Sequence, residues 1–296
     1  MNKLTLITVM AVVLMSCKNN KEEYDASGTF ESIETIVSAE ANGVIAKLSI
    51  EEGQVIEEGK IIGYIDSTQL FLKRKQLLAQ IKALLSKRPD IQTQTAALEA
   101  QLKQAETEQK RVQNLVTANA ATQKQLDDLT AQVSIIKKQI EGQQSVLGIT
   151  SNGITEESEP LKIQIEQLDD QLSKCKIINP IKGTVLVKYV EVNEMTAAGK
   201  PLYKLADLST IILRAYITGD QFGEVKIGQA VKVLVDKGKS DYKDYEGVVE
   251  WLSNKAEFTP KTIQTKDERA NLVYAIKIKI KNDGLLKIGM YGEVKF

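Results

Sequence analysis

The side chains that most often carry out chemistry in proteins are scarce in this chain. Its 296 residues contain no histidine and only two cysteines, Cys17 and Cys175. This excludes a histidine general base and most zinc or copper sites, and two cysteines are too few for a four-thiolate metal centre. Basic and acidic residues both number 39, and a zero net charge argues against a nucleic-acid partner. We therefore expect no enzyme, no catalytic residues, no cofactor and no metal.

Cys17 follows an apolar segment, Leu4–Met15. This segment is shorter than the roughly 20 residues of a membrane-spanning helix and has the length of a signal-peptide core. Leu14–Cys17 resembles a bacterial lipobox, although Met15 stands where a small residue is usual. The resemblance implies a signal peptide at 1–16, acylation of Cys17, and a lipid-bearing linker at 17–26. An ordinary signal peptide with an incidental cysteine is the alternative.

The middle of the chain has the pattern of a coiled coil. Apolar residues alternate at steps of three and four in three series, 91–116, 126–147 and 161–175. These stripes are narrow, which suits two paired helices rather than a helix buried in a large core. We predict an antiparallel helical hairpin over 67–175, in which Cys175 is a small buried apolar residue and not a reactive thiol.

The turn of this hairpin is predicted at about 117–122. Asn119 can adopt a left-handed backbone conformation, and Thr122 can cap a following helix. Two expected breaks, Lys87–Asp90 and Leu147–Pro160, lie about 30 residues before and after the turn. If the chain folds back at residue 119, these breaks lie side by side.

Two similar segments bracket the hairpin. Each contains two glycines 16 residues apart, with a lysine after the second, namely Lys60 and Lys200. Each is also divided into short strands by glycine or asparagine turns. A unit this short cannot bury a face alone, so we expect the halves 38–66 and 176–208 to pack together.

The repeat resembles the two half-motifs of a biotinyl/lipoyl carrier domain, and Asn179–Gly183 is similar to the entry into the second half. A hairpin inserted between such halves resembles the HlyD-type periplasmic adaptor family, also called membrane fusion proteins. A swinging-arm carrier is the competing interpretation. However, the turn that would present its modified lysine is replaced by the hairpin, so Lys60 and Lys200 are expected to be solvated surface lysines.

The region 209–296 has the alternation of half-buried strands, clearest in Ala275–Lys281. We expect a small β-barrel that also takes in a strand at 27–37. Ile227–Val233 and Ile288–Val294 resemble barrel signatures of the adaptor family. The fold class is thus mixed α and β, elongated, with a coiled-coil hairpin inserted in a split lipoyl-like domain and followed by a barrel.

The partner transporter is suggested by the C-terminal region. The segment 258–265, with Leu272–Tyr274 behind it, resembles a short subgroup of adaptors that lack a membrane-proximal domain and serve ABC-type exporters. An adaptor for a proton-driven RND-type pump remains the alternative.

The expected turn also carries a family motif. The adaptor family has Arg, then Leu four residues on, then Ser seven further on, and Arg111, Leu115 and Thr122 have that spacing, with Thr for Ser. The resemblance implies that these residues contact a TolC-type outer-membrane channel. The alternative is an ordinary arginine beside the seam, a seam leucine and a helix cap.

Taken together, these features predict a lipid-anchored adaptor in the periplasm of a Gram-negative bacterium, with the inner membrane favoured. The resemblance implies a hexameric ring between a transporter and an outer-membrane channel. A passive envelope scaffold with no role in transport is the alternative from another class.

Overall fold

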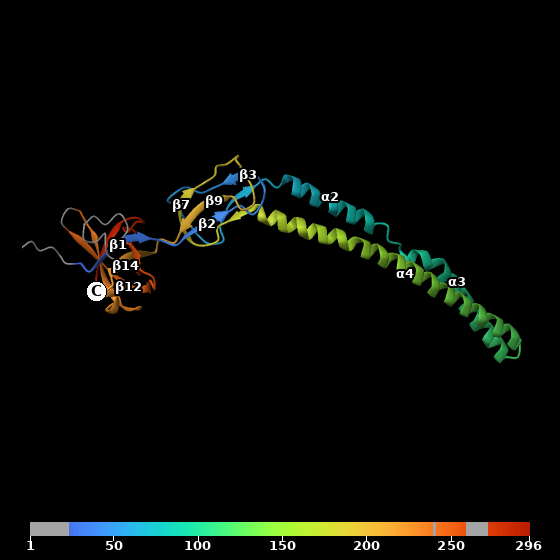
Figure 1. Ribbon diagram of the computed structural model, residues 1–296. Coiled ribbons are helices and arrows are strands. Elements are labelled where there is room, and N and C mark those ends of the chain that lie inside the picture. Colours follow the sequence, from blue (N-terminus) through green and yellow to red (C-terminus); the bar gives the residue numbers. More distant parts are fainter. Residues whose placement is uncertain (1–23, 239–240, 259–271) are drawn as a thin grey trace, which may run out of the picture.

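The computed structural model describes residues 24–238, 241–258 and 272–296. Three parts follow one another along an elongated molecule: a β-barrel, a unit of two small sheets and a helical hairpin (Figure 1). The predicted fold class is confirmed. The signal peptide and Cys17 lie outside the described residues, as does most of the segment 258–265.

The barrel closes through six antiparallel strands in the order β10-β1-β15-β11-β12-β14, with β14 returning to pair with β10. A short seventh strand, β13, pairs with the start of β14. The bounds are β1 Ala26–Glu31, β10 Thr210–Thr218, β11 Ala230–Asp236, β12 Tyr242–Leu252, β13 Glu257–Phe258, β14 Leu272–Lys281 and β15 Tyr291–Lys295. Alternation turns Ile276, Ile278 and Ile280 into the barrel core, so this barrel is a packed body without a lumen.

The second part consists of two four-stranded sheets, β2-β9-β7-β4 and β6-β5-β3-β8. The first half supplies β2 Glu34–Ser38, β3 Gly43–Leu48, β4 Val55–Ile56 and β5 Ile61–Ile65; the second supplies β6 Lys176–Ile178, β7 Gly183–Lys188, β8 Met195–Thr196 and β9 Pro201–Ala206. Every pairing in these sheets except β3–β5 and β7–β9 joins one half to the other. The halves therefore share a core that neither could enclose alone.

One expected boundary was wrong. The segment 27–37 was predicted to be a single strand of the barrel. Instead, β1 pairs with β10 and β15 in the barrel, whereas β2 pairs with β9 in the two-sheet unit. The chain thus crosses between the two bodies at residues 32 and 33, where no strand is formed.

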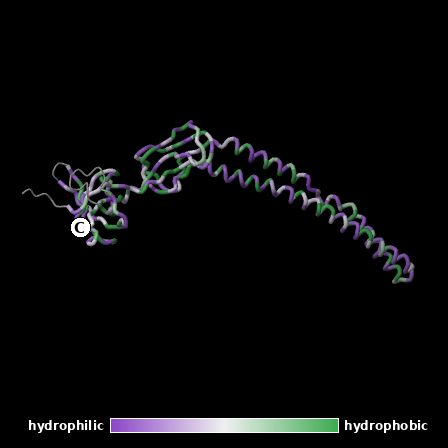
Figure 2. The backbone as a smooth tube through the Cα atoms, viewed as in Figure 1, coloured by the Kyte–Doolittle hydropathy of each residue, from purple (hydrophilic) through white to green (hydrophobic). Residues whose placement is uncertain are grey.

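The hairpin consists of α2 Thr68–Leu85, α3 Ile91–Thr117 and α4 Gln123–Lys174. Polar and apolar residues alternate along both arms (Figure 2). One apolar cluster joins α2 to α4 around Leu77 and Leu168, and a second joins α3 to α4 around Ala105 and Ile136. Cys175 is buried at the base, as predicted.

Only one of the two expected breaks is present. The first arm is interrupted at 86–90, where Pro89 precedes the helix-capping Asp90. The prediction of a break at Leu147–Pro160 is wrong, because α4 runs unbroken through this segment with Pro160 inside it. Proline removes one helical hydrogen bond, and the contacts of α4 with α2 and α3 hold the helix on both sides of that point.

Candidate functional site: the hairpin tip

The first arm ends in a compact turn. The amide of Ala120 donates to the carbonyl of Leu115 (2.7 Å), and that of Asn119 donates to Val116 (3.0 Å). Asn119 has φ 56°, in the left-handed region. This is the Schellman arrangement, which satisfies the last carbonyls of a helix and reverses the chain within few residues. The left-handed Asn119 agrees with the sequence argument.

The second arm begins with a capping box at Thr122. Its backbone amide donates to Oε1 of Gln125 (3.0 Å), and the amide of Gln125 donates to Oγ1 of Thr122 (3.4 Å). Two amides at the start of α4 are satisfied in this way. The hydroxyl of Thr122 thus accepts a hydrogen bond from its own helix start, while the residue itself stays exposed.

The three predicted docking residues all lie near this turn. Arg111 and Leu115 are four residues apart and so share one side of α3, while Thr122 starts the opposite arm. Arg111 is exposed, Leu115 is half-buried and Thr122 is exposed. The turn thus presents a cation, an apolar side chain and a hydroxyl at the far end of the molecule (Figure 1).

Arg111 has an internal partner that the sequence interpretation missed. Its guanidinium forms two hydrogen bonds with the carboxylate of Glu108, one helical turn back. The hydrogen bond from Arg111 lowers the pKa of Glu108, and the same bond raises the pKa of Arg111. Any acidic or carbonyl partner of Arg111 must compete with Glu108. The spacing of three residues between an acid and a base could have revealed this pair.

The lysines of the competing carrier interpretation lie on turns within each half. Lys60 and Lys200 follow Gly59 and Gly199, which have φ of 73° and 86°. The ammonium of Lys200 donates to the carbonyl of Met195 (3.0 Å). The link between the halves, from β5 to β6, is the hairpin itself. Neither lysine therefore occupies the position that a swinging arm would need.

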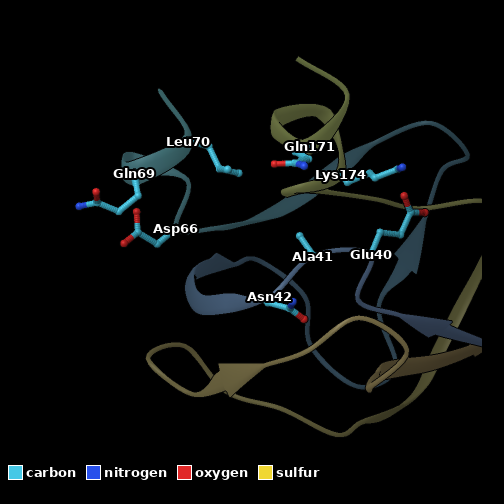
Figure 3. A pocket seen from close by; sticks show the side chains of 8 residues that line it. All are labelled: Glu40, Ala41, Asn42, Asp66, Gln69, Leu70, Gln171 and Lys174. Atoms are coloured by element: carbon cyan, nitrogen blue, oxygen red, sulfur yellow. The ribbon is translucent and has the colours of Figure 1, made fainter. Parts of the chain in front are cut away.

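An open cleft lies where the hairpin meets the two-sheet unit (Figure 3). Its carboxylates are Glu40 and Asp66. Asp66 accepts hydrogen bonds from the amide and hydroxyl of Thr68 (3.0 and 2.7 Å), and these bonds lower the pKa of Asp66. This carboxylate therefore satisfies the first amide of α2. Lys174, on the opposite wall, is paired with Asp170 on its own helix.

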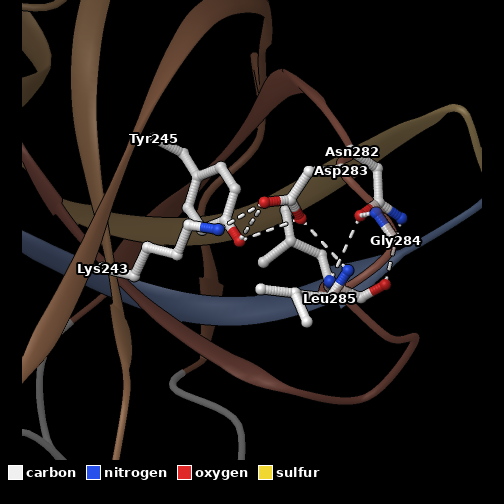
Figure 4. Close-up of polar contacts among 7 residues, drawn as sticks. Lys243, Tyr245, Asn282, Asp283, Gly284 and Leu285 are labelled. Carbon is white, nitrogen blue, oxygen red and sulfur yellow. Dashed lines mark hydrogen bonds and ion pairs between the residues drawn. The ribbon is translucent and has the colours of Figure 1, made fainter.

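A second polar cluster ties a barrel turn to β12 (Figure 4). Lys243 and the hydroxyl of Tyr245 (3.1 Å) both donate to Asp283, and Asn282 accepts from the amide of Gly284 (2.8 Å). The hydrogen bond from Lys243 lowers the pKa of Asp283. These contacts stay within one turn and its neighbouring strand, so the cluster is structural.

No group of three or more histidine, cysteine or acidic side chains is placed to hold a metal ion in 24–238, 241–258 or 272–296. In the same ranges, no helix combines the length and the hydropathy that crossing a membrane requires.

A helical hairpin inserted between the halves of a two-sheet unit, beside a closed six-stranded barrel, is the architecture of membrane fusion proteins, also called periplasmic adaptors. MacA from Actinobacillus actinomycetemcomitans has a TM-score of 0.53 and 24% identity over 91% of this chain and 76% of its own. The membrane fusion protein Spr0693 from Streptococcus pneumoniae has a TM-score of 0.50 and 15% identity over 91% of this chain and 96% of its own. The chain thus has the membrane fusion protein fold.

Among curated proteins, the UPF0194 membrane protein YbhG of Salmonella gallinarum is 35% identical over 126 residues. The match spans 42% of this chain and 38% of that relative's length. A UPF0194 membrane protein of Yersinia enterocolitica matches to the same extent. No family model matches the chain.

Proposed function

We propose that this protein is an HlyD-type periplasmic adaptor that links an inner-membrane transporter to a TolC-type outer-membrane channel. The observation that supports this most directly is the hairpin tip. Two long helical arms lead to one tight turn, and that turn exposes Arg111 and Thr122 beside the half-buried Leu115. In this proposal the adaptor performs no chemistry and holds a conduit together.

The tip offers contacts suited to the helix ends of a channel. Arg111 can donate several hydrogen bonds to carbonyls or carboxylates, and Leu115 supplies an apolar contact. Each copy presents one such set. A ring of about six copies, as the family resemblance implies, would repeat these weak contacts and gain affinity through multivalency.

The other end of the molecule is the proposed transporter side. An acylated Cys17 would hold the barrel beside the inner membrane, because few residues separate Cys17 from β1. The resemblance of 258–265 and Leu272–Tyr274 favours an ABC-type transporter over an RND-type pump. A spacer without a transport role would share this fold, and only a linked transporter distinguishes the two.

The docking role is tested by reversing the charge at the tip. We expect Arg111→Asp to abolish export and crosslinking to the channel, because the tip then repels the groups that Arg111 binds. Lys110→Asp is the matched control, since it makes the same charge change at the neighbouring exposed position. Both variants should retain helix content and membrane attachment. Normal export by Arg111→Asp would remove the docking assignment.

The partners are tested by mild crosslinking in native membranes, followed by capture of the full-length protein and mass spectrometry. Recovery of an ATPase-linked permease together with an outer-membrane channel supports the proposal. Recovery of a proton-driven pump retains the adaptor and discards the ABC preference. Recovery of the protein alone favours the scaffold.

A further inference from the structure

The end of the barrel remote from the two-sheet unit carries exposed apolar side chains. β10 starts next to the two-sheet unit and ends at Thr218, which pairs with Val273 near the start of β14. The residues before β1 and β11, the end of β13 and the start of β14 therefore share this remote end. We use the name outer rim for four exposed apolar residues in the described part of this end: Tyr24, Ile227, Phe258 and Leu272.

Two of these residues form an exposed pair. Phe258 and Leu272 are direct partners in an antiparallel pairing, so their side chains project from the same face. Phe258 is 80% exposed and Leu272 is 55% exposed. A contiguous exposed apolar patch, unlike a single exposed side chain, marks a contact surface, and Phe258 and Leu272 are contiguous. The intervening residues 259–271 lie outside the described part of the chain and are not included in this surface.

The start of the described chain belongs to the same end. The amide of Asp25 donates to the carbonyl of Val294 (2.9 Å), and Gln221 donates to the carbonyl of Asp25 (2.8 Å). Gln221 lies in the short helix η1, Gln221–Gly223, which follows β10. These contacts hold Asp25, the residue before β1, at this end of the barrel.

We propose that the outer rim lies in the interfacial layer of the lipid bilayer that carries the acyl anchor. This rests on the acylation of Cys17 in the proposed function. From Cys17 to Tyr24 the chain advances seven residues, which span at most about 25 Å when fully extended. The rim is the part of the barrel that this tether brings to the membrane first. Apolar side chains held this close to the bilayer can bury themselves at the boundary between headgroups and acyl chains.

The contact is apolar rather than electrostatic. Lys226 and Lys255 are exposed near the rim, but Asp25, Asp220 and Glu224 share this end of the barrel. Acidic side chains there offset the attraction of lysines for anionic headgroups. We therefore expect little dependence of the contact on salt or on the fraction of anionic lipid.

The test uses the lipidated full-length protein in phosphatidylcholine vesicles that contain neither transporter nor channel. The only tryptophan, Trp251, is first removed as Trp251→Phe, and Phe258→Trp then places a reporter on the rim. Brominated acyl chains quench only tryptophans that reach the bilayer. We expect emission to fall about twofold in brominated relative to ordinary vesicles, because interfacial side chains enter the acyl boundary.

Ile33→Trp in the same background is the matched control. Ile33 is 76% exposed but lies in the crossing to the two-sheet unit, at the opposite end of the barrel. Its emission should be the same in both vesicles. Adding Leu272→Asp should relieve the quenching at position 258, since a carboxylate resists entry into lipid.

Three outcomes would overturn the proposal: equal emission from position 258 in both vesicles, equal quenching at positions 33 and 258, or a blue shift that depends on protein concentration and not on lipid. The last would assign the rim to a second copy of the chain. Export plays no part in this assay. If position 258 is not quenched, the rim proposal fails and the tip-docking proposal is unaffected. If a tip variant fails to export, the tip-docking proposal is at issue and the rim proposal is unaffected.

Discussion

The phenol of Tyr203 donates a hydrogen bond of 2.9 Å to Oδ1 of Asn179, and both side chains are fully buried in the two-sheet unit. Nδ2 of Asn179 donates in turn to the carbonyls of Glu57 (3.0 Å) and Ile181 (2.6 Å). Glu57 belongs to the first half and Asn179 to the second. One amide thus joins two halves that are separated by the whole hairpin.

Removing this amide should loosen the junction between the halves. We expect Asn179→Leu to destabilise the unit by about 2 kcal/mol or more, because the hydroxyl of Tyr203 and two carbonyls lose their partners while buried. The amide of Gly59, which donates to the carbonyl of Asn179 (2.8 Å), should exchange hydrogen faster. Tyr203→Phe is the milder comparison, since it removes one of these bonds. Equal exchange in Asn179→Leu and the native protein would contradict this role.

Thr122 should affect the second arm through its cap as well as through docking. Thr122→Ala is expected to destabilise the start of α4 by about 1 kcal/mol, the usual cost of losing such a cap. Faster amide exchange at Gln125 is the measurement. Thr122→Ser keeps the cap and should exchange at the native rate. If Thr122→Ala exports normally despite a frayed helix start, its hydroxyl acts in capping alone.

Acid should fray the starts of α3 and α4 differently. Oδ2 of Asp90 accepts from the hydroxyl of Thr93 (2.7 Å), and this bond lowers the pKa of Asp90 below its usual value. A carboxyl with a depressed native pKa stabilises the fold above its unfolded value, near pH 4, and loses this contribution as the pH falls through the native value. Amide exchange at Thr93 should therefore accelerate below about pH 4, after correction for intrinsic rates.

The capping box at Thr122 contains no titratable group and serves as the control within the same molecule. Exchange at Gln125 should keep its relative protection over this pH range. Asp90→Asn should remove the pH dependence at Thr93. A parallel acceleration at Thr93 and Gln125 would indicate general acid unfolding instead.

The middle of the hairpin should be its most bendable part. The interruption at 86–90 faces α4 near Thr155, to which Arg88 donates a hydrogen bond. On α4, Gly148 and Gly153 lie in this region, and an added Cβ would meet no atom within 4 Å at either. Glycine lowers helix stability by about 1 kcal/mol relative to alanine. We expect Gly148→Ala with Gly153→Ala to stiffen the joint.

The measurement is the distance distribution between spin labels at the base and the tip of the hairpin, which should narrow in the double variant. Gly142→Ala is the matched control, because Gly142 has the same open surroundings and lies in the part of α4 that packs on α3. It should leave the distribution unchanged. Equal narrowing in both variants would show that flexibility is spread along the helix.

Local signals in the sequence determined much of this molecule. The left-handed turn at Asn119 and the cap at Thr122 depend on residues within a few positions, where side-chain chemistry acts directly on the backbone. The strand repeat was equally clear in the sequence, since Gly59 and Gly199 serve equivalent left-handed turns before β5 and β9. The narrow seams predicted a paired hairpin, because only a two-helix contact buries so thin a stripe.

Tertiary structure decided what depends on distant partners. Glycines and Pro160 predicted a break that is absent, because packing against α2 and α3 keeps α4 helical where local propensity is weak. The segment 27–37 is divided between two bodies because β1 and β2 find different partner strands, β10 and β9, far along the chain. The gathering of Phe258, Leu272 and Tyr24 at one end was likewise not visible in the sequence. The β13–β14 pairing sets Phe258 beside Leu272. The pairing of β10 with both β1 and β14 brings Tyr24 to the same end, and no local pattern encodes these long-range pairings.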